Sequence, residues 1–424
     1  MKVFLLLAFA LVSVTSAARL EEVLAWKQID YVWPSAEAKE AAIKSGKFLQ
    51  IHNLPLGLDR WRDKLFVTVP RWKSGVASTL NYVNLTEALD NKSPDLVPYP
   101  NWEANKLPSS GQGDDTTPSS GESSSNGLVD NSTIISTFRV RVDECDRLWV
   151  MDCGLVDILG TPKVYAKPAL LIFDLHTDQL IKRYTFEPTD LKEDSFFANV
   201  VVDVRPDACE DAFAYIPDLG AYGVVVYSFR DDDSWRVSHN YFHFEPLAGE
   251  YDIAGVQFQW TDGVFGIALS KHQPDGYRTA YFHAMSSTKE FAVSTRLLQN
   301  STWAHSPEAY HEFKLVGDRG PKGQSSASFL HENSGVLFYT QVNKDGIACW
   351  NSGKPYNEFT QGVVAQDPYK LVFPNDLKVD YEDNVWVLSD RMPLFIYRDI
   401  NPAEVNYRIL KVSVKDAVVG TPCA

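Results

Sequence analysis

The sequence has few positive charges and few sulfur-containing residues for its size. Its 424 residues include 40 Lys and Arg against 55 Asp and Glu, which gives a formal net charge of -15, and only 5 Cys and 4 Met. A broad nucleic-acid-binding surface needs clustered Lys and Arg, so we expect no nucleic-acid partner. Hydrophobic residues still make up 45% of the chain, a composition that excludes a largely disordered protein.

The short motifs that mark common enzyme and metal sites are also absent. The chain has no G-x-S-x-G nucleophile elbow, no P-loop and no H-E-x-x-H zinc motif. His239 and His243 lie four residues apart, but two ligands are too few for a metal site. The run Asp231–Asp233 could bind calcium, although such a run between two strands is more often a solvated turn. We therefore expect neither a bound metal nor a cofactor.

The one long apolar run lies at the N-terminus. Lys2 precedes the apolar stretch from Val3 to Val14, and four small residues follow at 15–18. This order is typical of a secretory signal peptide, and the run is shorter than a membrane-spanning helix requires. We predict that residues 1–18 are removed, that the protein is secreted to the extracellular space and that it has no membrane partner.

Secretion makes three N-glycosylation sequons meaningful, at Asn84, Asn131 and Asn300. A further sequon at Asn91 is weaker, because Pro94 follows it directly. An extracellular location also permits disulfide bonds.

A repeated pattern runs along the chain on both sides of a Ser- and Gly-rich segment, residues 108–127. That segment has no large apolar residue, so we expect a flexible insertion. In each copy of the repeat, a short apolar strand leads to a tight polar turn and then to a second strand rich in Trp, Phe and Tyr. The copies at 141–151 and 378–388 align without gaps, and looser copies contain turns near positions 63, 211, 262 and 334.

These six copies predict an all-β protein, a six-bladed β-propeller with antiparallel four-stranded blades around a central channel. One small sheet cannot cover both of its faces, whereas six sheets packed radially bury their faces against one another. We predict a single propeller domain over residues 19–424, with a β-sandwich of coincidentally similar hairpins as the weaker alternative.

The predicted architecture places a candidate site at one mouth of the channel, where the innermost strand of each blade begins. The strand starts carry phenyl rings, amides, hydroxyls and one carboxylate, a mixture found in small-ligand pockets. The residues predicted at this mouth are His52, Asn53, Thr137, Phe138, Phe197, Ala198, Asn199, Ala254, Gly255, Ser325, Ser326, Phe373, Pro374, Asn375 and Asp376. Asp376 could pair with an amine, and Phe197 and Phe373 could stack on an aromatic ring. Alternatively, the polar side chains only satisfy backbone groups or ordered water at the strand ends.

Longer segments of the sequence point to a known family. They include LFVTVPRW at 65–72, LVPYPNW at 96–102, RVDECDRLWVMDCG at 141–154, DAFAYIPDLGAYGVVVYS at 211–228 and NVWVLSDRMP at 384–393. These segments resemble the yellow and major royal jelly protein family of insects, and its yellow branch in particular, over about residues 25–423. The resemblance implies a secreted six-bladed propeller, in agreement with the repeat.

The resemblance also bears on the odd number of cysteines. It implies the disulfides Cys145–Cys209 and Cys349–Cys423. Cys153 then remains as a free, buried thiol at a position where relatives usually carry Thr or Ser.

For function, the resemblance implies a part in cuticle pigmentation and melanin formation. The first hypothesis is a monomer that binds a small aromatic amine or catechol at the channel mouth. The second is a dopachrome-converting isomerase, which needs a general base close to the substrate, and Asp376 or His52 could serve. The third and more distant is a metal-dependent, lactonase-like hydrolase, for which Asn199, Asn375 and Asp376 lack a second carboxylate.

Overall fold

The computed structural model describes residues 20–108 and 131–424. The predicted signal peptide (1–18) and all but the first residue of the predicted insertion (108–127) lie outside the described residues.

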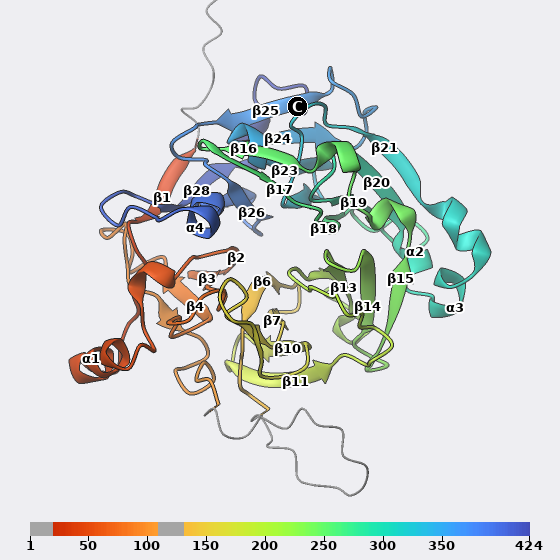
Figure 1. Cartoon of the computed structure of the whole chain (residues 1–424). Helices are drawn as coiled ribbons and strands as arrows, with labels where there is room; N and C mark the ends of the chain where they lie inside the picture. Colours follow the sequence, from red (N-terminus) through yellow and green to blue (C-terminus); the bar gives the residue numbers. More distant parts are fainter. Residues whose placement is uncertain (1–19, 109–130) are drawn as a thin grey trace, which may run out of the picture.

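Six four-stranded antiparallel sheets surround a common axis, which confirms the predicted six-bladed β-propeller (Figure 1). Strands β2, β6, β12, β18, β22 and β26 lie nearest the axis, and most neighbouring pairs of them are in contact. Within each blade, the strands are named here from the axis outward. The first three blades are β2–β5 (Gly57–Trp61, Lys64–Thr68, Leu80–Asn84, Val97–Pro98), then β6, β7, β10 and β11 (Thr137–Val142, Arg147–Asp152, Ala169–Asp174, Gln179–Thr185), and then β12–β15 (Val201–Asp203, Phe213–Asp218, Gly223–Ser228, Asp233–Ser238). The other three are β18–β21 (Val264–Leu269, Thr279–Ala284, Lys289–Ser294, Lys314–Asp318), then β22–β25 (Ser328–His331, Val336–Gln341, Gly346–Asn351, Gln361–Gln366), and finally β26, β27, β28 and β1 (Pro374–Val379, Asn384–Ser389, Tyr407–Ser413, Glu21–Trp26).

The ring is closed by strands from both ends of the chain. Strand β1 pairs antiparallel with β28, with Trp26 opposite Tyr407, and so completes the last blade. The structure forms both disulfides that the resemblance implied. Cys145–Cys209 joins two neighbouring blades, and Cys349–Cys423 fastens the end of the chain to β24. The last blade is therefore built from both ends of the chain, which closes the ring.

The ungapped alignment of the two clearest repeats reflects one hydrogen-bonded turn. The carboxylate of Asp143 accepts the indole N–H of Trp149 at 2.7 Å, and that of Asp380 accepts the indole N–H of Trp386 at 2.7 Å. Each turn also contains an Asp in the left-handed conformation, at φ +56° and +59°. The turn therefore fixes both the reversal of the chain and the position of the buried indole beside it.

One predicted copy of the repeat is wrong. Five of the predicted turns join an innermost strand to the second strand of its blade, but the turn near position 262 precedes β18, which is itself the innermost strand. The segment before it forms a separate hairpin, β16 (Glu250–Ile253) and β17 (Val256–Gln259), whose turn is Ala254 and Gly255. Strand β18 is buried along its whole length, so its aromatic and apolar run looked like a second strand.

His52 and Asn53 are likewise not at a strand start. His52 ends the 3₁₀ helix Gln50–His52, and β2 begins only at Gly57.

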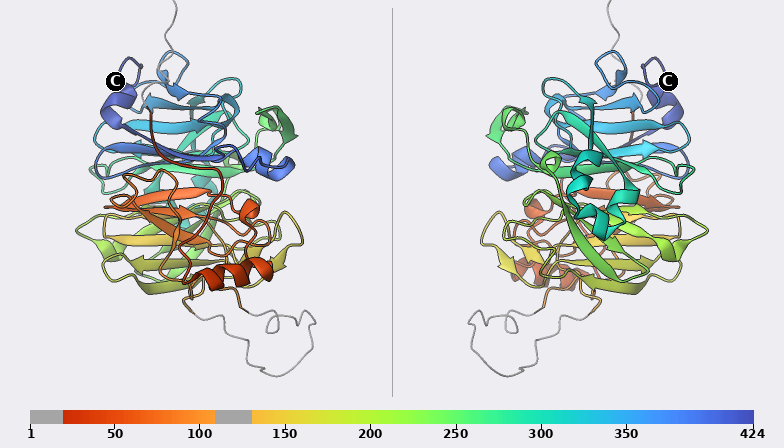
Figure 2. Two further views of the ribbon diagram at one scale, coloured as in Figure 1. Left: turned by 90° about the vertical axis from the view of Figure 1, so that its left-hand side faces the viewer. Right: turned by 90° about the vertical axis from the view of Figure 1, so that its right-hand side faces the viewer.

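One face of the disc carries most of the structure outside the blades. Helix α1 (Ala36–Lys44), helix α4 (Met392–Tyr397), the β16–β17 hairpin and the hairpin of β8 and β9 (Leu155–Val156, Lys163–Val164) lie on this face (Figure 2). The shorter helices α2 (Thr295–Leu298), α3 (Ser301–Ala304) and α5 (Val414–Val418) lie elsewhere. Among the described helices, none has the length and apolar character needed to cross a membrane.

The three sequon asparagines lie at the surface. Asn131 and Asn300 are exposed, and Asn84 is partly exposed at the end of β4. Asn300 also caps helix α3, because its side-chain oxygen accepts the backbone N–H of Trp303 at 2.9 Å.

We expect the free thiol of Cys153 to be unreactive in the native protein. It is 8% exposed, and burial, together with the neighbouring Asp152, raises its pKa to about 12, so almost no thiolate forms at neutral pH. Iodoacetamide at pH 8 should therefore label Cys153 only after unfolding, which peptide mass mapping without reduction would detect. Labelling of the folded protein, or Cys153 found in a disulfide, would contradict this assignment.

Candidate ligand-binding site

The channel contains two separate chambers, each of about 310 Å³. The apolar chamber opens on the face that carries α4, and its aromatic walls are Trp72, Phe138, Phe196, Trp260, Phe265 and Tyr397. The polar chamber opens on the opposite face, where the innermost strands end, and its polar lining includes Arg139, Arg141, Glu144, Asn199, Arg278, Asp376 and Lys378.

A partition of side chains separates the two chambers. The guanidinium of Arg139 lies over the ring of Phe265, 4.1 Å from its centre, and its N–H groups donate to the carbonyl oxygens of Ser326 and Asn375. Phe265 and Asn375 face the apolar chamber, whereas Arg139 faces the polar one. A ligand at one mouth therefore meets a different chemistry from a ligand at the other.

The outer wall of the apolar chamber comes from two segments outside the blades. Trp260 follows β17, and Met392, Ile396 and Tyr397 belong to α4. The indole N–H of Trp260 donates to the hydroxyl oxygen of Tyr397 at 2.7 Å, which ties the hairpin to the helix. Phe258 packs against Tyr397 with the ring centres 5.1 Å apart. These contacts make a continuous aromatic edge at this mouth.

Asp262 is the one carboxylate that lines the apolar chamber within the described part of the chain. Burial raises its pKa to about 6, and none of the described cations forms a salt bridge with it. A carboxylate without a counter-ion in an apolar site is costly unless a ligand supplies the opposite charge. A protonated amine would supply it, and the surrounding aromatic faces attract the same cation.

Asp390 lies beneath the floor of the apolar chamber and differs from Asp262. Its carboxylate oxygens accept the amide N–H of Asn375 at 2.6 Å and the backbone N–H of Met392 at 3.1 Å. Burial raises its pKa well above the usual range. It fixes Asn375 and the start of α4 rather than facing a ligand.

The structure distributes the predicted mouth residues over several places. Phe138, Ala198 and Asn375 line the apolar chamber, whereas Asn199 and Asp376 line the polar chamber. The remaining residues of the predicted set line neither chamber: His52, Asn53, Thr137, Phe197, Ala254, Gly255, Ser325, Ser326, Phe373 and Pro374.

The hydroxyls in this group bond to the backbone. Ser326 Oγ donates to the carbonyl oxygen of Asn375 at 2.7 Å, and Thr137 Oγ1 donates to that of Thr79 at 3.1 Å. His52 Nδ1 lies 2.7 Å from the carbonyl oxygen of Ser74, outside the apolar chamber. These positions match the alternative in which strand-end polar groups serve the backbone.

Asp376 is already paired within the protein. It accepts hydrogen bonds from Lys378 Nζ at 2.8 Å and from the backbone N–H of Leu58 at 3.0 Å. Burial alone would raise the pKa of Asp376, but Lys378 and Arg139 hold it below its usual range. This carboxylate is therefore not available to an amine in the apolar chamber, on the other side of the partition.

Sequence reasoning assigned Asp262 to a turn of the repeat and did not consider it as a site residue. It missed Trp260 and α4, because neither belongs to the repeated strand pair. The available signal was the alternation Phe258, Trp260, Asp262, which puts two aromatic rings and a carboxylate close together just before an innermost strand. For metals, the described residues contain no group of three or more His, Cys, Asp and Glu that would hold an ion.

The fold and the apolar chamber define a six-bladed β-propeller with a ligand-sized cavity at one end of its channel. The model of the major royal jelly protein family matches residues 135–423. The chain is 39% identical to "Protein yellow" of Drosophila subobscura over 422 residues, covering 99% of this chain and 70% of that protein. It is 38% identical to "Protein yellow" of Drosophila melanogaster over 410 residues, covering 96% and 71%. The chain belongs to the yellow and major royal jelly protein family.

Alignments with solved structures have much lower sequence identity. Virginiamycin B lyase from Staphylococcus aureus aligns with a TM-score of 0.42 and 10% identity, over 86% of this chain and 96% of that one.

Proposed function

We propose that this protein is secreted and acts in insect cuticle pigmentation by binding a small aromatic amine or catechol in the apolar chamber. The observation that carries this proposal is Asp262, a carboxylate without a counter-ion among aromatic rings. The volume of about 310 Å³ lies at the lower end of the range for small-molecule pockets. Membership of the yellow family supports the place in pigmentation, and the two disulfides support secretion.

The expected arrangement follows from the chemistry of the walls. An aromatic ring would lie against Trp260 and Phe138, which offer stacked or edge contacts. The ammonium group would pair with the carboxylate of Asp262 and lie over a ring face.

We expect dopamine to bind more tightly than catechol, because catechol has no ammonium group. The difference should be about tenfold or more at pH 7.5, equivalent to about 1.4 kcal/mol. Dopamine affinity should fall as the pH drops below about 6, where Asp262 becomes protonated, while catechol affinity should stay constant. Calorimetric titration at several pH values measures both. Equal affinities for the two compounds, or a pH-independent dopamine affinity, would contradict the role of Asp262.

The same carboxylate favours the isomerase as a second candidate function. A general base works best with a pKa close to the pH of the reaction, and burial raises that of Asp262 to about 6. His52 lies outside the chamber and Asp376 is paired with Lys378, so the base assigned to this reaction changes to Asp262. Dopachrome consumption by the wild-type protein that is lost in Asp262→Asn would establish the isomerase activity. Binding without turnover would leave ligand binding as the function.

A further inference from the structure

One indole N–H group in the described part of the chain is buried without a hydrogen-bond partner. It belongs to Trp72, which is 7% exposed and lines the apolar chamber. A buried donor without an acceptor is destabilising, because it loses its hydrogen bond to water on folding and gains none in return. Such a group in a folded protein therefore calls for an explanation.

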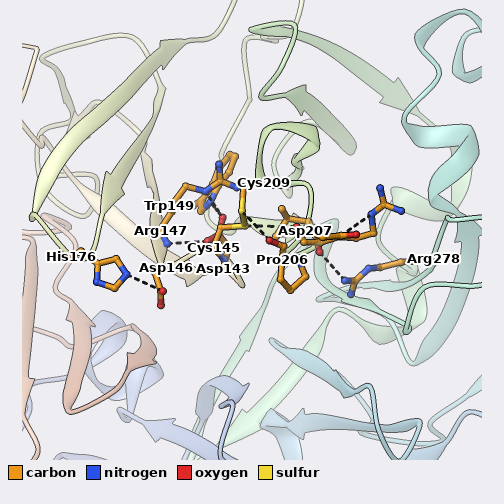
Figure 3. The surroundings of a disulfide bond; sticks show 12 residues. Asp143, Cys145, Asp146, Arg147, Trp149, His176, Pro206, Asp207, Cys209 and Arg278 are labelled. Carbon is orange, nitrogen blue, oxygen red and sulfur yellow. Dashed lines mark hydrogen bonds and ion pairs between the residues drawn. A yellow bond between two sulfur atoms is a disulfide. The ribbon is translucent and has the colours of Figure 1, made fainter.

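The other buried tryptophans show that this protein normally satisfies its indole N–H groups. Beside the Cys145–Cys209 disulfide, for example, Trp149 donates to the carboxylate of Asp143 at 2.7 Å (Figure 3). Each of the five other buried tryptophans in the described residues has an acceptor, and the pairs are Trp26 with Pro94, Trp61 with Asp146, Trp149 with Asp143, Trp350 with Lys354 and Trp386 with Asp380. The missing acceptor is therefore particular to the one buried indole at the ligand-sized cavity.

The side-chain oxygens in the wall of the apolar chamber do not supply this acceptor. The amide oxygen of Asn375 already accepts a hydrogen bond from Arg139 at 3.1 Å. The hydroxyl oxygen of Tyr397 already accepts one from Trp260 at 2.7 Å. Among the described side chains of the wall, this leaves the carboxylate of Asp262, which comes from another part of the ring.

Trp72 and Asp262 come from opposite sides of the propeller. Trp72 belongs to the loop between β3 and β4 of the first blade, and Asp262 lies just before β18, the innermost strand of the fourth blade. In a ring of six, the first and fourth blades face each other across the axis (Figure 1). A ligand that pairs with Asp262 and spans the chamber therefore brings its far end to Trp72. Phe138 packs against Trp72, with the ring centres 5.7 Å apart, and offers an aromatic wall along this path.

We propose that Trp72 is a specificity-determining residue of the apolar chamber, which selects aromatic amines that carry an oxygen atom on the ring, at the end away from the amine. This inference rests on the proposed function. The Nε1–H of Trp72 donates to the phenolic oxygen, while the ammonium group pairs with Asp262. An amine without the ring oxygen leaves the indole N–H unpaired, so the site discriminates against it.

The test compares tyramine with phenethylamine, which differ only in the hydroxyl group at the far end of the ring. Calorimetric titration of the full-length protein at pH 7.5 is expected to show that tyramine binds about tenfold more tightly. Trp72→Phe keeps an aromatic ring but removes the N–H, so it should abolish this difference and leave the affinity for phenethylamine unchanged. The control Trp303→Phe changes a partly exposed indole on α3, outside the chamber, and should keep the difference.

The outcomes separate the role of Trp72 from the proposed function. Equal affinities of the wild-type protein for the two amines, or a preference for tyramine that survives in Trp72→Phe, would overturn the role of Trp72 and leave the amine site standing. Binding of neither amine would overturn the proposed function, and this inference with it.

Circular dichroism shows whether Trp72→Phe folds. If it does not fold, a crystal structure of the wild-type protein with tyramine decides. The phenolic oxygen is expected about 3 Å from Trp72 Nε1. A bound tyramine whose oxygen points away from Trp72 would overturn the inference.

Discussion

Replacing Asp262 with Asn is expected to weaken dopamine binding about 10- to 100-fold and, at the same time, to stabilise the protein. The loss of affinity follows from removing the one carboxylate that faces the apolar chamber, since hydrogen bonds to charged groups contribute about 1.5–3 kcal/mol. The gain in stability follows from removing a charge that the empty protein buries without compensation.

The stability effect has a defined dependence on pH. Burial raises the pKa of Asp262 from 3.8 to about 6, so the folded state holds this proton more tightly than the unfolded chain does. The wild-type carboxyl therefore costs no stability below about pH 4, and its cost grows between pH 4 and 6. Because the side chain is partly exposed, we expect Asp262→Asn to raise the free energy of unfolding by about 1–2 kcal/mol at pH 7.5.

Urea denaturation of both proteins at pH 4 and pH 7.5 measures this difference. The two curves should nearly coincide at pH 4 and separate at pH 7.5. An Asn variant that is less stable at pH 7.5 would show that the carboxylate is held by a partner within the protein, and would remove the reason for assigning it to a ligand.

Replacing Arg319 with Met is expected to lower the free energy of unfolding by about 3–5 kcal/mol, the cost of leaving a buried charge without its partner. Arg319 Nη1 donates to Glu290 at 2.5 Å, and His283 Nδ1 lies 3.0 Å from the same oxygen. All three side chains are 0% exposed. Burial and the charge of Arg319 lower the pKa of His283, so in the native protein Arg319 is the cation that pairs with Glu290.

Chemical denaturation compares this variant with Arg296→Met, which removes an exposed guanidinium outside the blade core. The control should change stability by less than about 0.5 kcal/mol. Equal effects of the two substitutions would mean that the buried pair between β20 and the loop after β21 does not hold this blade together.

The number of blades was predictable because a turn between the two innermost strands recurs along the chain, and two blades form it with the same hydrogen bond. The turn in which Asp143 and Asp380 accept an indole N–H six residues further on depends on residues close together in the sequence. Such a unit is recognisable from residue order alone. The copy near position 262 failed because β18 is buried on both faces, so its composition does not distinguish an innermost strand from the next one.

The candidate site was only partly predictable, because its walls come from segments that do not repeat. Phe138 and Asn375 belong to innermost strands and were placed at the channel mouth from the pattern. Trp260 and Tyr397 come from a hairpin and a helix whose approach depends on contacts between distant parts of the chain. The partner of Asp376 was close in sequence, but the direction in which Lys378 points depends on the closed ring.

A crystal structure of the protein grown with saturating dopamine tests the central claim most directly. The catechol ring should lie in the apolar chamber against Trp260 and Phe138, with its ammonium nitrogen about 3 Å from the carboxylate of Asp262. An empty apolar chamber at saturating dopamine, or dopamine bound elsewhere on the propeller, would contradict it.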